Sequence, residues 1–211
     1  MNQRLETAFV VGVPLALALL ELYHPQPHDL LHLDLRAWMT VHYLQIVLFP
    51  LVALALARLV RGRRGFAAAL CRVGAFVFGV SWVAFDTAAG VRTGILLEGA
   101  RTSGTPETWR EPIMAIWNHP IVGAGASPDS APLLAVAGAI AWMLGCLAAA
   151  FTLRRAGSSW IPVALLAISA VSFGVFKSHA APGGPTAFGA LAAAAVWLRY
   201  RQTLPSSARL S

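Results

Sequence analysis

Charged residues are scarce in this chain. Only 12% of its 211 residues are Asp, Glu, Lys or Arg, whereas 57% are hydrophobic. A soluble domain carries about 25% charged residues, so this composition argues against an ordinary water-soluble fold. The two cysteines, Cys71 and Cys146, form no CxxC spacing, which gives no sign of a disulfide framework or a thiol redox motif. We therefore expect a lipid bilayer to be the solvent of this protein.

Lysine is almost absent, since Lys177 is the only one beside 15 arginines. A lone lysine invites a functional interpretation because its amine can lose a proton or form a Schiff base. Lys177, however, is expected at the outer end of a helix and off the face that carries His179. We interpret it as a side chain that extends toward the membrane surface.

Six apolar stretches approach the roughly 20 residues that a helix needs to cross the hydrocarbon. They cover residues 7–23, 37–60, 66–90, 131–153, 160–177 and 185–197. The last is short, so it could begin near residue 181 or lie in a locally thinned bilayer. The sequence therefore predicts an all-α bundle of six transmembrane helices, forming one domain over residues 1–211.

Arginines gather in alternate connections, namely the second, the fourth and the C-terminal tail. Short cytoplasmic loops carry such an excess, so both termini are predicted to be cytoplasmic and residues 24–36 to lie outside. The expected location is a cell membrane, crossed several times, and specifically the plasma membrane of a bacterium. Most of the net charge of +7 lies in these connections. They are expected to contact anionic lipid, and no nucleic-acid partner is expected.

The longest outer connection, residues 91–130, has the features of a short interfacial helix. Pro106 suits a first helical position, and Trp109 and Ile113 recur at helical spacing. Pro112 is expected to end or kink that helix. Two interpretations stay open: a segment anchored at the membrane surface by Trp109 and Trp117, or a lid over an outer pocket.

Polar residues inside the predicted spans point to a site near the outer surface. His42 and Gln45 share one face of the second span, Asp86 lies near the outer end of the third, and His179 lies at the end of the fifth. An ionisable group in hydrocarbon is costly and usually faces the bundle interior. We therefore expect His42, Asp86 and His179 to lie together. Each also has a simpler explanation. His42 could make only an interhelical hydrogen bond, Asp86 could be solvated or pair with Arg92, and His179 could be an ordinary loop residue.

The first outer connection adds His24, His28 and His32. His28 and His32, four residues apart, would share one helical face and suit two imidazole ligands of one metal. Glu21 and His24, three residues apart, could present a carboxylate and an imidazole together. Zinc, copper, iron and manganese all suit such ligands, and the spacing does not select among them. The alternative is a solvated interfacial turn.

Three function classes remain open. The first is a metal-dependent enzyme acting on a small-molecule or lipid substrate at the outer leaflet. Its ligands would be His42, His179 and one or more of His24, His28 and His32, with Asp86 as general base or ligand-orienting group. The second is a haem-bearing electron carrier with His42 and His179 as axial ligands. The third is a transporter or accessory subunit, although the inner halves of the spans carry few polar residues. Small residues in the spans, such as Gly138 and Gly145 of the fourth, could let helices approach closely within the fold or across an oligomer.

Overall fold

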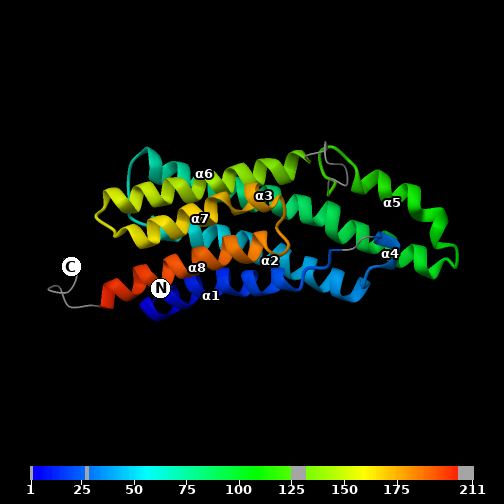
Figure 1. Ribbon diagram of the computed structural model, residues 1–211, viewed down its shortest axis with the longest axis horizontal. Helices are drawn as coiled ribbons and strands as arrows, with labels where there is room; N and C mark the ends of the chain where they lie inside the picture. Colours follow the sequence, from blue (N-terminus) through cyan, green and yellow to red (C-terminus); the bar gives the residue numbers. More distant parts are fainter. Residues whose placement is uncertain (1, 27–28, 125–131, 204–211) are drawn as a thin grey trace.

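The computed structural model describes residues 2–26, 29–124 and 132–203, and these residues form helices without any strand. Six long helices lie side by side (Figure 1). They are α1 (Gln3–Leu22), α2 (Leu35–Leu59), α3 (Phe66–Phe85), α6 (Leu133–Arg155), α7 (Trp160–Phe176) and α8 (Gly183–Thr203). One end of the bundle carries the start of α1, the end of α8, the α2–α3 connection and the α6–α7 connection (Figure 1). Each of the six predicted apolar stretches overlaps one of these helices.

Four helical segments are long and apolar enough to cross a membrane: Gln3–Leu22, Leu35–Leu59, Phe66–Thr102 and Leu133–Arg155. The fifth stretch, α7, is a shorter apolar helix. Large apolar side chains such as Phe66, Phe76 and Val175 remain exposed on the bundle surface. Water would disfavour these exposed side chains, whereas lipid accommodates them. The fold is compatible with a membrane protein.

Aromatic side chains fill the centre of the bundle. Those of Phe49, Phe78, Trp142 and Phe188 are fully buried, and their rings contact one another with centroids 4.5–6.4 Å apart. The indole Nε1 of Trp142 donates a hydrogen bond to the carbonyl of Ser169 at 3.2 Å. The one polar atom of this ring is thereby satisfied. The central core is therefore largely apolar and closely packed.

Glycines allow a close contact between α3 and α6. A Cβ on Gly74 would lie 2.7 Å from the carbonyl oxygen of Ala141 and 3.0 Å from the Cα of Gly145. A Cβ on Gly138 would overlap the indole ring of Trp82. Small residues let membrane helices approach closely enough for van der Waals contact between backbones. The close approach predicted for small residues of the fourth span thus occurs within the fold.

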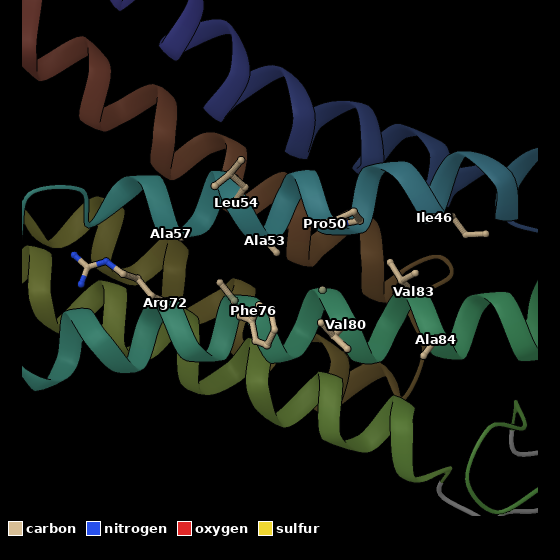
Figure 2. A pocket seen from close by; sticks show the side chains of 12 residues that line it. Ile46, Pro50, Ala53, Leu54, Ala57, Arg72, Phe76, Val80, Val83 and Ala84 are labelled. Atoms are coloured by element: carbon tan, nitrogen blue, oxygen red, sulfur yellow. The ribbon is translucent and has the colours of Figure 1, made fainter. Parts of the chain in front are cut away.

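A groove follows the face shared by α2 and α3 (Figure 2). It has a volume of about 720 Å³ and is lined almost entirely by apolar side chains. The groove exists because Pro50 and Ala53 of α2 oppose Gly79 of α3, where bulky side chains would otherwise meet. Ile46 lies toward one end of the groove and Arg72 toward the other (Figure 2).

The sequence predicted that the third helix ends near Gly90, but the helix continues past this residue. A π-helical turn, η2 (Asp86–Val91), leads directly into α4 (Arg92–Thr102). A glycine costs only about 1 kcal/mol in a helix, so Gly90 and Gly94 are not stop signals. The continuous helix of 37 residues is about 55 Å long at 1.5 Å per residue, well beyond the roughly 30 Å of hydrocarbon. Its end projects from the bundle (Figure 1).

The projecting helix is part of a small folded lobe. The lobe comprises α4, η1 (Leu30–His32), η3 (Pro106–Trp109) and α5 (Arg110–Trp117). Leu31, Leu97 and Ile113 are buried in a second apolar cluster that also includes Trp38 of α2. Pro106 begins η3, as predicted. Pro112 neither ends nor breaks a helix, contrary to the prediction, because it lies in the first turn of α5, where an N–H is not needed.

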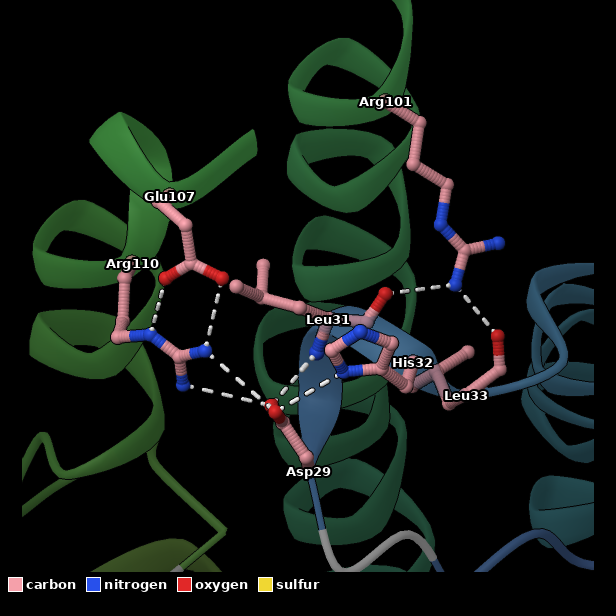
Figure 3. A network of polar contacts seen from close by, with 7 residues as sticks. All are labelled: Asp29, Leu31, His32, Leu33, Arg101, Glu107 and Arg110. Carbon is pink, nitrogen blue, oxygen red and sulfur yellow. Dashed lines mark hydrogen bonds and ion pairs between the residues drawn. The ribbon is translucent and has the colours of Figure 1, made fainter. Parts of the chain in front are cut away.

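Asp29 ties the lobe together (Figure 3). Its carboxylate accepts hydrogen bonds from the amide of Leu31 at 3.1 Å and from the guanidinium of Arg110 at 3.4 Å, and lies 3.0 Å from His32 Nδ1. Arg110 also donates to Glu107 at 2.8 Å. The Leu31 amide, Arg110 and His32 together lower the pKa of Asp29 to about 2. These bonds favour the charged carboxylate and link η1 to α5.

Acid should therefore loosen the lobe. The pKa of Asp29 is lower in the folded state than its ordinary value of 3.8, so its stabilisation is complete above that value and is lost as pH falls toward about 2. We expect hydrogen exchange at the amides of residues 30–33 to accelerate over this window. Asp29→Asn should remove the acid dependence, whereas Glu98→Gln, elsewhere on the lobe, should retain it. An unchanged profile in Asp29→Asn would contradict this role.

The α3–α6 contact makes a second prediction. Replacing Gly74 or Gly174 by Ala raises the helix propensity of the chain by the same amount. The added Cβ meets the α6 backbone at position 74, whereas the space at position 174 is open. Gly74→Ala should be less stable than Gly174→Ala by roughly 1–3 kcal/mol, the usual cost of overpacking. Equilibrium unfolding in mixed detergent micelles measures the difference. Equal stability of the two variants would show that the helices separate freely.

Candidate metal centre at one end of the bundle

Glu21 lies in the last turn of α1 and is the most deeply placed carboxylate of the site. Its exposed fraction is 0%. Its Oε1 accepts a hydrogen bond from Gln45 Nε2 of α2 at 2.8 Å, and its Oε2 lies 3.2 Å from His179 Nδ1. The start of α8 closes over it, because a Cβ on Gly184 would lie 2.7 Å from the Glu21 Cγ. Three helices thus enclose this carboxylate.

His24 follows α1 by two residues and turns back toward the bundle. Its Nδ1 lies 2.9 Å from the carbonyl oxygen of Pro25. A carbonyl only accepts, so Nδ1 carries the proton and Nε2 carries a free lone pair. That Nε2 is buried and has no hydrogen-bond partner among the described residues. Burial, followed by the neighbouring His179 and His42, lowers the pKa of His24 to about 2. The imidazole is therefore neutral, which is the form that binds metals.

His179 lies in the α7–α8 connection, immediately before the start of α8. Lys177 ends α7 in the left-handed conformation, with φ 51°, and turns the chain so that His179 faces the bundle. Its ring packs 4.6 Å from that of His24 and 4.9 Å from that of Trp82. The Lys177 side chain is exposed and lies outside this cluster.

Glu21, His24 and His179 together have the spacing of a metal site. One ligand atom from each lies within 4.8 Å of the other two. Tetrahedral ligands bonded at 2.0–2.2 Å lie about 3.3–3.6 Å apart, and the Glu21–His179 separation of 3.2 Å already fits. Two imidazoles and one carboxylate form the ligand set of several catalytic zinc sites, in which the fourth position stays open. These three residues could hold a metal ion such as zinc.

His42 and Asp86 form a second buried pair beside this centre. His42 Nδ1 donates to the carbonyl of Trp38 at 2.7 Å, so its Nε2 lone pair faces Asp86 Oδ1 at 3.7 Å. Asp86 is 1% exposed, and neither carboxylate oxygen has a hydrogen-bond partner among the described residues. Two facing acceptors repel one another unless a proton, a water or a cation lies between them. The pair is therefore a proton-accepting or cation-attracting position.

The π-helical turn places Asp86 in this position. Its wider turn displaces the backbone of residues 86–91, and the indole Nε1 of Trp38 donates to the carbonyl of Gly90 at 2.8 Å. Gly90 has no side chain, and a Cβ there would overlap the ring of His42. Single π-turns inside helices occur frequently at functional sites. Here the turn brings α3 against α2 at the depth of the histidines.

The structure brings four of the predicted site residues together. The His24 ring lies between His42 and His179, with centroids 5.0 and 4.6 Å away, and Asp86 faces His42. His32 is placed elsewhere: its side chain is 77% exposed and pairs with Asp29. Asp29 is extended and caps a 3₁₀ turn of only three residues, Leu30–His32, so no α-helix includes residues 29–32. His28 lies outside the described residues.

Of the three candidate ligands, Glu21 is the one that the sequence indicated least clearly. It was visible only as a carboxylate in the last turn of an apolar helix, three residues before His24. Among the described residues, no ion pair joins Asp86 to Arg92. No protein-family model, curated protein or solved structure matches this chain. The chemistry of the site therefore follows from its own residues.

Proposed function

We propose that this chain is an integral membrane protein that binds a transition metal, with zinc the best match, through Glu21, His24 and His179. One observation carries the proposal. The buried Nε2 of His24, which has no hydrogen-bond partner among the described residues, lies in the same cluster as the fully buried carboxylate of Glu21. No Lys or Arg pairs with Glu21 in the part of the chain that the structure describes. A buried carboxylate is costly without a compensating positive charge. A divalent cation supplies that charge.

The neighbouring pair supports a metal-dependent enzyme. A zinc ion held by three protein groups acts as a Lewis acid and lowers the pKa of a water in its open position. His42 Nε2 and the Asp86 carboxylate are buried acceptors beside His24 and can take up a proton there. This combination fits hydrolysis of a small-molecule or lipid substrate at the outer leaflet.

The packing around the histidines disfavours the two alternatives. A haem between His42 and His179 would need a flat slot, but the His24 ring occupies that space and Trp38 packs 4.2 Å from His42. A transport path would need polar groups deeper in the bundle, where Phe49, Phe78 and their aromatic neighbours form an apolar core. Copper and iron suit the same ligands and remain outcomes of the metal analysis.

The proposed topology has six spans, with both termini in the cytoplasm and the metal centre near the outer surface of a bacterial plasma membrane. Two features support it. The arginine-rich connections, the start of α1 and the end of α8 share one end of the bundle, and the lobe projects from the other (Figure 1). Cytoplasmic connections carry the Lys/Arg excess.

Metal binding should depend on His24 and not on His32. Purified protein should retain about one zinc per chain by elemental analysis. His24→Ala should weaken zinc affinity by more than about 100-fold, beyond the 10–100-fold that outer partners of a metal site contribute. His32→Ala is the matched control because His32 is exposed and paired with Asp29. Equal zinc affinity in the two variants, both with wild-type melting temperatures, would refute the site.

Cysteine labelling tests the topology separately. In a background without Cys71 and Cys146, Ser103→Cys at the end of α4 and Ser158→Cys in the α6–α7 connection should react with a membrane-impermeant thiol reagent from opposite sides. Ser103 should label in intact cells and Ser158 only after the membrane is opened. Labelling of both from one side would contradict the six-span arrangement, while the metal analysis would still stand.

A further inference from the structure

We propose that the groove between α2 and α3 binds one anionic phospholipid, with an acyl chain in the groove and the phosphate at Arg72. The site is distinct from the metal centre and has its own chemistry. The groove is lined by ten uncharged side chains, by Gly79 and by one cation, Arg72. That combination of a long apolar surface with a single terminal positive charge matches the two parts of a phospholipid.

The shape of the groove suits an acyl chain. It extends from Ile46 to Ala57 along α2, which corresponds to about 16 Å at 1.5 Å per residue. Its floor consists of small residues, including Ala53, Ala75 and Gly79. Exposed Leu54, Phe76 and Val80 form its rims (Figure 2). A linear hydrocarbon chain fills such a surface with van der Waals contacts that two flat helix faces would lack.

Arg72 is held in place for a phosphate. Its Nη2 donates to the carbonyl of Val60 at 3.2 Å and to that of Arg63 at 2.7 Å, which fixes the guanidinium over the end of α2. No carboxylate of the described residues pairs with it. Its Nε and Nη1 make no hydrogen bond among those described, so they can donate to phosphate oxygens.

The surroundings of Arg72 also favour an anion. Arg61, Arg63 and Arg64 belong to the same α2–α3 connection. Within the described part of the chain, only Arg61 of these three forms an ion pair, 3.8 Å from Glu6. Clustered arginines beside a membrane helix attract anionic head groups. Charge complementarity therefore selects an anionic lipid over a zwitterionic one. Placement in the inner leaflet rests on the proposed topology, but binding itself does not.

Native mass spectrometry of the full-length protein tests the proposal. The protein is exchanged into detergent micelles with equal amounts of phosphatidylglycerol and phosphatidylcholine of identical acyl chains, and the lipid retained per chain is counted. Wild-type protein should retain one phosphatidylglycerol in preference to phosphatidylcholine. Arg72→Gln should reduce that preference by about fivefold. Arg155→Gln, an arginine at the same end of the bundle that stacks on Phe151, should leave it unchanged.

A second pair of variants tests the acyl-chain part. Gly79→Leu fills the groove and should abolish retention of the single lipid. Gly79→Ala adds a Cβ only 3.4 Å from that of Ala53, an ordinary contact, and should retain it. Both variants should keep the zinc content of the wild type. Any of three outcomes would overturn the proposal. They are equal retention of the two lipids by the wild type, loss of lipid retention with Arg72→Gln but not with Gly79→Leu, and a dimer in place of bound lipid.

Discussion

The burial of two carboxylates at one end of an apolar bundle is the constraint on which the rest of the structure depends. Glu21 is 0% exposed and Asp86 is 1% exposed, and neither pairs with Lys or Arg within the described residues. Their closest positively chargeable neighbours are the imidazoles of His179 and His42. Burying an anion in a medium of low dielectric constant costs several kcal/mol, which a cation or a shared proton offsets. In the function we propose, a bound metal would supply that positive charge for Glu21, and Asp86 lies beside the same histidine cluster.

The helices end or deform at the depth where these groups meet. α1 ends beside Glu21, the α7–α8 connection presents His179, and the π-turn in the third helix presents Asp86. Below them lies the aromatic core around Phe49, and above them Trp38 packs 5.9 Å from Trp117 of the lobe. This arrangement limits access of water from both directions. Electrostatic interactions are stronger in such an enclosure than in water.

Much of this architecture could be predicted from the sequence, because hydropathy and helical spacing are local properties. The six long helices follow from apolar length, and the shared depth of His42, Asp86 and His179 follows from their positions within those helices. The π-turn could not be predicted, since it depends on a tertiary hydrogen bond from Trp38 to the carbonyl of Gly90. His32 lies away from the histidine cluster for a similar reason: Asp29 contacts Arg110, 81 residues away, and holds that turn in the lobe. Long-range contacts, and not local propensity, decided these two cases.

The most direct test of the central claim is X-ray absorption spectroscopy of the zinc-loaded protein at the zinc edge. Coordination by Glu21, His24 and His179 predicts a first shell of nitrogen and oxygen only, at about 2.0–2.2 Å, with the outer-shell scattering of two imidazoles. A sulfur shell near 2.3 Å would assign the metal to Cys71 or Cys146 instead. A shell of oxygen alone, without imidazole scattering, would show a hydrated ion outside the histidine cluster. Either of these spectra would contradict the proposed centre.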